Sequence, residues 1–156
     1  MVLPKKGNQQ EKVHCIRDIQ RDVGEMKEAL LDVYAFTGCD TVSAIYRKGK
    51  IVPFKKVQAY KALHTKLLRF NDTNADPNAM ADAGKHFLVS IFGSRNTDDL
   101  DTRSHQCYFE TIAKQPVHSM FKLCALPLTL AAAKQHSCRA YSQLQQWLNE
   151  QKYKLE

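Results

Sequence analysis

An aspartate followed by a strongly basic turn is the feature of this sequence with the clearest chemical use. The apolar run before it ends in the triplet Gly38-Cys39-Asp40, and the basic turn is Arg47-Lys48-Gly49-Lys50. Carboxylate oxygens are ligands for hard cations such as Mg²⁺ or Mn²⁺. Glycine in a turn lets backbone N–H groups approach a phosphate closely. This order therefore predicts a metal-holding carboxylate at Asp40 beside a phosphate-binding turn.

The positive charge of the chain is concentrated in the same region. Residues 41–71 contain eight Lys or Arg and no Asp or Glu, so this segment carries +8 while the whole chain carries +7. Such a segment is typical of a nucleic-acid surface, and it also occurs as an ordinary solvated face. The predicted contacts to a DNA or RNA backbone are Arg47, Lys48, Gly49, Lys50, Lys55 and Lys56. Beyond Lys55 the basic residues do not form one helical stripe, which disfavours insertion of a helix into a groove.

Other patterns exclude several kinds of site. The five cysteines form no C-x-x-C pair, which indicates reduced thiols in an intracellular protein and no zinc site. There is no H-E-x-x-H or G-x-S-x-G motif, and no catalytic residue is assigned. The longest near-apolar run, 123–133, contains Pro127 and is too short to cross a bilayer. We expect a protein of the nucleus or cytoplasm with no membrane partner.

The elements that must position these residues are helical. Apolar spacing predicts helices over 16–23, 26–36, 80–92 and 100–114, and a long one after Pro127. Two shorter predictions concern the site itself: a helix over 41–46 with Asp40 or Thr41 as its N-cap, and one that begins near Pro53 and continues to Leu63. No alternating run predicts a strand. The fold class is therefore all-α, or mainly so.

The 156 residues, 44% of them apolar, fit one globular domain. Within it we expect a flexible tail over 1–12, a helical region with the Gly-Cys-Asp triplet and the basic turn over 13–70, a linker loop over 71–79, and a helical region over 80–156. The last helix carries Tyr141, Leu144, Trp147 and Leu148. These four side chains are either core residues or a docking face for a protein partner.

Residues 12–56 resemble the later part of the flap-endonuclease-like, PIN-related family of 5′ nucleases. In that family two short helices lead to a G-[SC]-D triplet and then to a helix-turn-helix element that grips duplex backbone. Here the triplet ends at Asp40, and Asp32 lies eight residues before it, a spacing that the family also shows. The family places a glycine where this chain has Arg47 and keeps a second glycine where this chain has Gly49.

A narrower resemblance covers two blocks. Ala35-Phe36-Thr37-Gly38-Cys39-Asp40-Thr41-Val42-Ser43 is similar to the "HAFTGCDT" signature of proteins associated with animal transposable elements. Gln135-His136-Ser137-Cys138-Arg139-Ala140-Tyr141, with Gln146-Trp147-Leu148, resembles a second marker of that group. The resemblance implies the helical C-terminal part of a PIN/flap-endonuclease-like fold without its parallel sheet. In the family, several carboxylates at that sheet help to hold two divalent ions, which hydrolyse a phosphodiester.

Three functional hypotheses follow. The favoured one is a transposon-derived, catalytically incomplete nuclease-like chain that binds nucleic acid weakly and without sequence preference through residues 47–69. The second is a Mg²⁺- or Mn²⁺-dependent, structure-specific nuclease whose other carboxylates are supplied elsewhere. The third is a helical protein-interaction module. For single residues, Asp40 is otherwise an ordinary N-cap, and we expect Asp32 to face solvent or to pair with a lysine.

Overall fold

A computed structural model describes residues 2–3, 12–93, 99–116 and 119–154. The predicted, mainly α-helical fold is confirmed. In the described part, the α-helices are α1 (Ile16–Val23), α2 (Leu30–Phe36), α3 (Ile51–Ala59), α4 (Lys61–Leu67), α5 (Pro77–Ile91), α6 (Leu100–Ile112) and α7 (Leu130–Lys154). Three 3-10 helices join them: η1 (Gly24–Lys27), η2 (Leu68–Asn71) and η3 (Leu123–Ala125). Among the described helices, none is both long and apolar enough to span a membrane.

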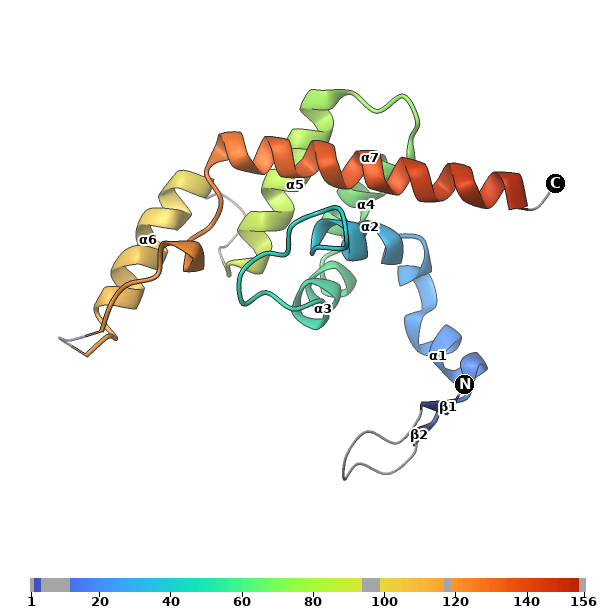
Figure 1. The fold of residues 1–156 in the computed structure, drawn as a ribbon, viewed down its shortest axis with the longest axis horizontal. Coiled ribbons are helices and arrows are strands. Elements are labelled where there is room, and N and C mark those ends of the chain that lie inside the picture. The colour runs from blue at the N-terminus through green and yellow to red at the C-terminus, as the bar shows by residue number, and fades with distance from the viewer. Residues whose placement is uncertain (1, 4–11, 94–98, 117–118, 155–156) are drawn as a thin grey trace.

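Helix α7, 25 residues long, runs along the body of the molecule from the side of α6 toward the C-terminus and crosses α5 (Figure 1). The most extensive helix pair is α5 with α7, followed by α2 with α7. Helix α6 projects from one end of this body, and α1 leads away from it toward the paired strands near the N-terminus (Figure 1). The basic turn and α3 therefore lie on the part of the body that α2, α5 and α7 hold together.

The centre of the core is the ring of Phe36, the last residue of α2. It packs edge-on against Phe87 of α5 and His136 of α7, each at 4.8 Å between ring centroids, and against Phe70 of η2 at 6.0 Å. The His136 Nε2 also donates a hydrogen bond of 2.7 Å to the Phe36 carbonyl oxygen, because a carbonyl can only accept. Burial lowers the pKa of His136, so this ring stays neutral and fills the core.

Several elements match their sequence predictions. Helices α1 and α6 begin and end close to the expected residues, and the expected stripe of α5 is buried at Met80, Ala83, Phe87 and Ile91. The Asp76 side chain caps α5 by accepting a hydrogen bond of 3.0 Å from the Ala79 N–H, with Pro77 as the first helical residue. Because η2 ends at Asn71 and α5 begins at Pro77, the connection is shorter than the expected 71–79 loop.

The predicted helix over 41–46 is wrong, and so is the role of Asp40 or Thr41 as its N-cap. Residues 37–50 form an irregular loop between α2 and α3. β-Branched residues such as Thr41 and Val42 disfavour a helix, and Val42 is instead buried in the core. The predicted helix from Pro53 is divided at Tyr60, whose extended backbone (φ −116°, ψ 94°) separates α3 from α4.

The N-terminal region contains a strand pair that the sequence did not predict. Two two-residue strands, β1 (Val2–Leu3) and β2 (Lys12–Val13), pair antiparallel with Val2 opposite Val13. β1 and Lys12 of β2 belong to the stretch 1–12 that we expected to be a flexible tail, and residues 1 and 4–11 lie outside the described residues.

The crossing of α5 and α7 depends on Gly84. A Cβ added there would lie 1.9 Å from the Ser137 Oγ and 3.1 Å from the Phe36 Cε2. We expect Gly84→Ala to destabilise the fold by about 1–3 kcal/mol in urea unfolding, although alanine is the better helix former. Gly84→Ala in a Ser137→Ala background should cost less, because the clashing oxygen is gone. The matched control is Gly49→Ala, where nothing lies within 4 Å of an added Cβ; an equal loss there would contradict this explanation.

Candidate nucleic-acid interface

The loop that carries Asp40 and the basic turn, residues 37–50, begins with a turn that requires glycine. The Thr37 hydroxyl donates a hydrogen bond of 2.7 Å to the Val33 carbonyl oxygen and so caps the last turn of α2. Gly38 then has φ +109°, and a Cβ at this position would lie 2.5 Å from the Ala44 Cα. Both the backbone conformation and the lack of space therefore exclude any larger residue at Gly38.

Loop 37–50 is held against the core although it has no regular structure. Val42 and Ile45 are buried, at 2% and 7% exposed, and the Cys39 N–H donates a hydrogen bond of 2.9 Å to the Val42 carbonyl oxygen. The Thr41 hydroxyl donates to the Gln143 Oε1 of α7, which fixes the loop to the long helix. These contacts give the basic turn a defined position.

Arg47 has a left-handed backbone in the basic turn. Its φ is +54°, which makes it the one non-glycine residue with a positive φ among those described. The Lys48 N–H donates a hydrogen bond of 3.0 Å to the Ile45 carbonyl oxygen and closes the turn. A left-handed residue with a Cβ costs about 1–2 kcal/mol. Arg47 is therefore placed where glycine would be the less strained residue, and its charged side chain is exposed.

Two of the predicted phosphate contacts have partners inside the molecule. The Lys48 Nζ lies 4.4 Å from the ring centroid of Phe92, and its burial there lowers its pKa. The Lys50 Nζ lies 3.7 Å from the ring centroid of Tyr34 and donates a hydrogen bond to the Gly38 carbonyl oxygen. Both lysines thus tie the turn to the body of the protein. Because Tyr34 and Phe92 are distant from the turn in sequence, the spacing of residues along the chain could not predict these contacts.

The positive charge of residues 41–71 is nearly uncompensated. Of its eight Lys and Arg, only Lys66 forms an ion pair within the described part of the chain, with Asp82 at 3.2 Å. The exposed members are Arg47, Lys50, Lys55, Lys61 and Arg69, of which Lys50 also contacts Tyr34. Lys56 is half-buried, and Gly49 is exposed with open space around its Cα. The loop, α3, α4 and η2 together therefore present several free cations to solvent.

Asp40 is exposed and makes no hydrogen bond or ion pair with any described residue. Nowhere in the described ranges do three His, Cys, Asp or Glu side chains come together as a metal-binding group would require. A two-ion hydrolytic centre needs several carboxylates around each ion. The described residues around Asp40 do not fit such a centre.

The expectation that Asp32 faces solvent or pairs with a lysine is wrong. Its side chain is 3% exposed, and the Asn71 Nδ2 donates a long hydrogen bond of 3.4 Å to its Oδ2, while its Oδ1 has no partner. Burial raises the pKa of this carboxyl to about 7, and the Asn71 hydrogen bond offsets only part of the effect. The Asp32 side chain is buried because α2 packs against η2 as well as against α7.

The two sequence blocks that resemble transposable-element-associated proteins touch each other in the fold. Phe36 of the first block contacts His136 of the second through ring packing and a hydrogen bond. Of the four α7 residues that we expected in the core or on a docking face, Leu144 is fully buried and belongs to the core. The Tyr141 hydroxyl lies 2.9 Å from the Asp72 carbonyl oxygen, and Trp147 packs on Tyr34 at 6.0 Å. Leu148 is half-buried against the core.

Comparison with models of protein families, with curated proteins and with solved structures found no match to this chain.

The buried Asp32 predicts a pH-dependent stability. Its pKa is about 7 in the folded state and 3.8 when unfolded, so the folded chain holds a proton that the unfolded chain releases. Stability should therefore fall as the pH rises from about 4 to about 7, by at most about 4 kcal/mol. His136 acts in the opposite sense, because its lowered pKa favours the folded state as the pH rises through its unfolded value.

Comparison of the wild type with Asp32→Asn isolates the Asp32 contribution. In urea unfolding from pH 4.5 to 8, we expect Asp32→Asn to be progressively more stable than the wild type toward high pH. Asp18→Asn is the matched control, since Asp18 is exposed and, among the described residues, pairs only with Arg21, at 2.9 Å. If the free energies of unfolding of the wild type and Asp32→Asn changed in parallel with pH, the buried carboxyl would be ionised without any loss of stability, which would contradict this prediction.

The left-handed backbone of Arg47 predicts that Arg47→Gly raises stability by about 1 kcal/mol in urea unfolding. The contact of its guanidinium with the Tyr46 ring, at 5.2 Å, is exposed and offsets only part of this gain. Lys55→Gly inside α3 should instead lower stability by about 1 kcal/mol. A loss of stability in Arg47→Gly would show that its side-chain contact outweighs the backbone strain.

Proposed function

We propose that this chain is a nuclease-like helical protein of transposable-element origin that lacks a complete catalytic centre and binds the backbone of DNA or RNA without sequence preference. The observation that carries the proposal is the uncompensated charge of residues 41–71. Eight basic residues and no acidic one lie in this segment, and one of the eight has a carboxylate partner in the described structure. A polyanion is the partner that such a surface attracts.

The exposed cations lie on a well-supported part of the fold. Val57 on the inner face of α3 is fully buried, while Lys55 is exposed on the same helix. Loop 37–50 is anchored to α7 through Thr41 and Gln143. Because the supporting helices are packed, little ordering entropy is lost when phosphates bind.

Contacts with aromatic rings distant in sequence divide the basic residues into two groups, since Arg47 and Lys56 contact only the nearby rings of Tyr46 and Tyr60 in the described structure. Lys48 and Lys50 hold the turn in place through Phe92 and Tyr34, so their removal would disturb the fold as well as any binding. Arg47, Lys55 and Lys56 are assigned to direct phosphate contact, with Gly49 allowing close approach. Phosphate contacts position a protein on nucleic acid and carry no base information.

The absence of sequence preference follows from the shape of this surface. Helix α3 is nine residues long, and its exposed apolar residues Ile51 and Val52 occupy its first turn. The first turn of a recognition helix normally presents polar side chains to base edges. We therefore assign α3 to contacts with phosphates rather than with base edges.

We expect the purified protein to bind duplex and single-stranded oligonucleotides with an affinity that falls linearly in a log–log plot against salt, between about 50 and 200 mM. Lys55→Ala/Lys56→Ala should weaken binding to all sequences alike and reduce the salt slope by about two, as measured by fluorescence anisotropy. The control is Lys114→Ala/Lys122→Ala, which removes the same charge outside residues 41–71.

Two results would overturn this proposal. The first is an affinity that does not change with salt, or that falls equally in the control variant. The second is Mg²⁺- or Mn²⁺-dependent cleavage of the oligonucleotides that is lost in Asp40→Ala, because the protein would then be an active nuclease.

A further inference from the structure

Residues 41–71 contain two tyrosines, Tyr46 and Tyr60, whose rings have no aromatic partner in the described part of the chain. Other tyrosine rings in that part pack on aromatic neighbours: Tyr34 on Trp147, Tyr108 on Phe109 and Phe121, and Tyr141 on Phe70. Tyr60 is 51% exposed, and Tyr46 is partly buried. The two rings without an aromatic partner therefore belong to the segment that carries the uncompensated positive charge.

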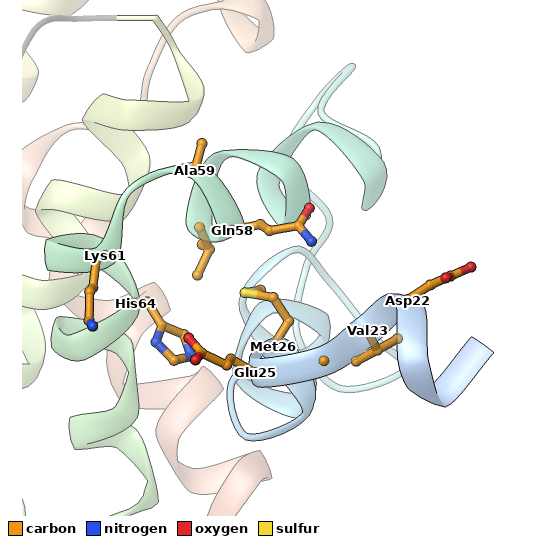
Figure 2. Close-up of a pocket in the computed structure, with 10 residues that line it drawn as sticks. Asp22, Val23, Glu25, Met26, Gln58, Ala59, Lys61 and His64 are labelled. Atoms are coloured by element: carbon orange, nitrogen blue, oxygen red, sulfur yellow. The ribbon is translucent and has the colours of Figure 1, made fainter. Parts of the chain in front are cut away.

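Tyr60 occupies the corner at which the chain turns from α3 into α4, between Ala59 and Lys61 (Figure 2). Its N–H donates a hydrogen bond of 3.0 Å to the Lys56 carbonyl oxygen, and its carbonyl oxygen accepts one of 2.9 Å from the Leu63 N–H. Both polar groups of its backbone are therefore satisfied within the fold. The corner holds the ring of Tyr60 at a defined place, so little ordering entropy is lost when a ligand contacts this ring.

Each of the two rings has a cation beside it. The Lys56 Nζ lies 5.7 Å from the ring centroid of Tyr60, and the Arg47 Cζ lies 5.2 Å from the ring centroid of Tyr46. Both cations belong to the residues that we assign to phosphate contact. Aromatic rings on which bases stack, combined with cations that follow the phosphates, are what proteins use to bind single-stranded nucleic acid.

We propose that the surface of residues 41–71 prefers single-stranded nucleic acid, because one base stacks on the exposed ring of Tyr60 while the adjoining phosphates contact Lys55 and Lys56. This inference rests on the proposed nucleic-acid binding and adds a contact with a base to it. In a duplex the bases stack on one another, so their faces are closed to Tyr60. Because every base has a flat face, the contact adds affinity without sequence preference.

Stacking and charge respond differently to salt. Phosphate contacts release counterions, so their contribution to affinity falls as the salt concentration rises. An uncharged ring releases none, so removing it should lower the affinity equally at every salt concentration. A duplex also has the steeper salt slope per phosphate contact, about −0.9 against about −0.7 for a single strand. The preference for a single strand over a duplex should therefore grow as salt is added.

The test compares three ligands of about 20 nucleotides by fluorescence anisotropy: a thymidine single strand, an abasic single strand that keeps the phosphates and lacks the bases, and a duplex. The wild type should bind the thymidine strand about fivefold or more tightly than the abasic strand. Tyr60→Ala should bind the thymidine strand about fivefold or more weakly than the wild type, with an unchanged salt slope. It should bind the abasic strand and the duplex as the wild type does.

Matched variants isolate the aromatic ring. Tyr60→Phe keeps the ring and should bind the thymidine strand as the wild type does. Tyr60→Leu keeps an apolar side chain without a flat face and should bind as weakly as Tyr60→Ala. Tyr108→Ala removes a tyrosine of α6 that is 37% exposed and lies outside residues 41–71, and it should bind as the wild type does. Thermal unfolding followed by circular dichroism checks that each variant is folded.

The outcomes distinguish this inference from the proposed function. Equal affinity of the wild type for the thymidine and abasic strands would overturn the stacking contact and leave the charge-based binding in place. Equal losses for single strand and duplex in Tyr60→Ala, or tighter binding of the duplex at about 200 mM salt, would do the same. Failure of all three ligands to bind would overturn the proposed function together with this inference.

Discussion

The close packing of Phe36 between α5 and α7 is the constraint on which the rest of the structure depends. Its ring touches Phe87 and His136, and its carbonyl oxygen accepts a hydrogen bond from the His136 ring. Gly84 leaves the space in which α7 can approach. Because Phe36 is the last residue of α2, the same contact fixes the point at which loop 37–50 leaves the core. The packing of Phe36 therefore also fixes the position of the basic turn.

The basic residues serve two physical purposes that their sequence does not distinguish. An ammonium group over an aromatic ring, as for Lys48 over Phe92, loses part of its hydration and gains a contact that stabilises the fold. An ammonium group in solvent, as for Lys55, keeps its hydration and remains free to meet a phosphate. The surface therefore combines a charged exterior with an interior layer that holds it in place.

The two aspartates of the motif have opposite environments. Asp32 is enclosed by α2 and η2 and holds a proton up to a pH of about 7, whereas Asp40 is exposed. Carboxyl groups that bind a metal ion must be deprotonated and must converge on one point. Asp32 holds a proton up to a pH of about 7, and Asp40 belongs to no group of three His, Cys, Asp or Glu side chains among the described residues. We therefore propose charge-based binding rather than hydrolysis.

The sequence by itself determined the helical class, the extents of α1, α5 and α6, and the segment that holds the positive charge, because periodicity, capping residues and composition are local properties. Only the tertiary structure decided that Thr41 begins no helix, that Asp32 is buried, that Lys50 packs on Tyr34, and that Leu144 belongs to the core. Each of these depends on which distant residue faces the side chain, and no spacing along a single chain contains that information.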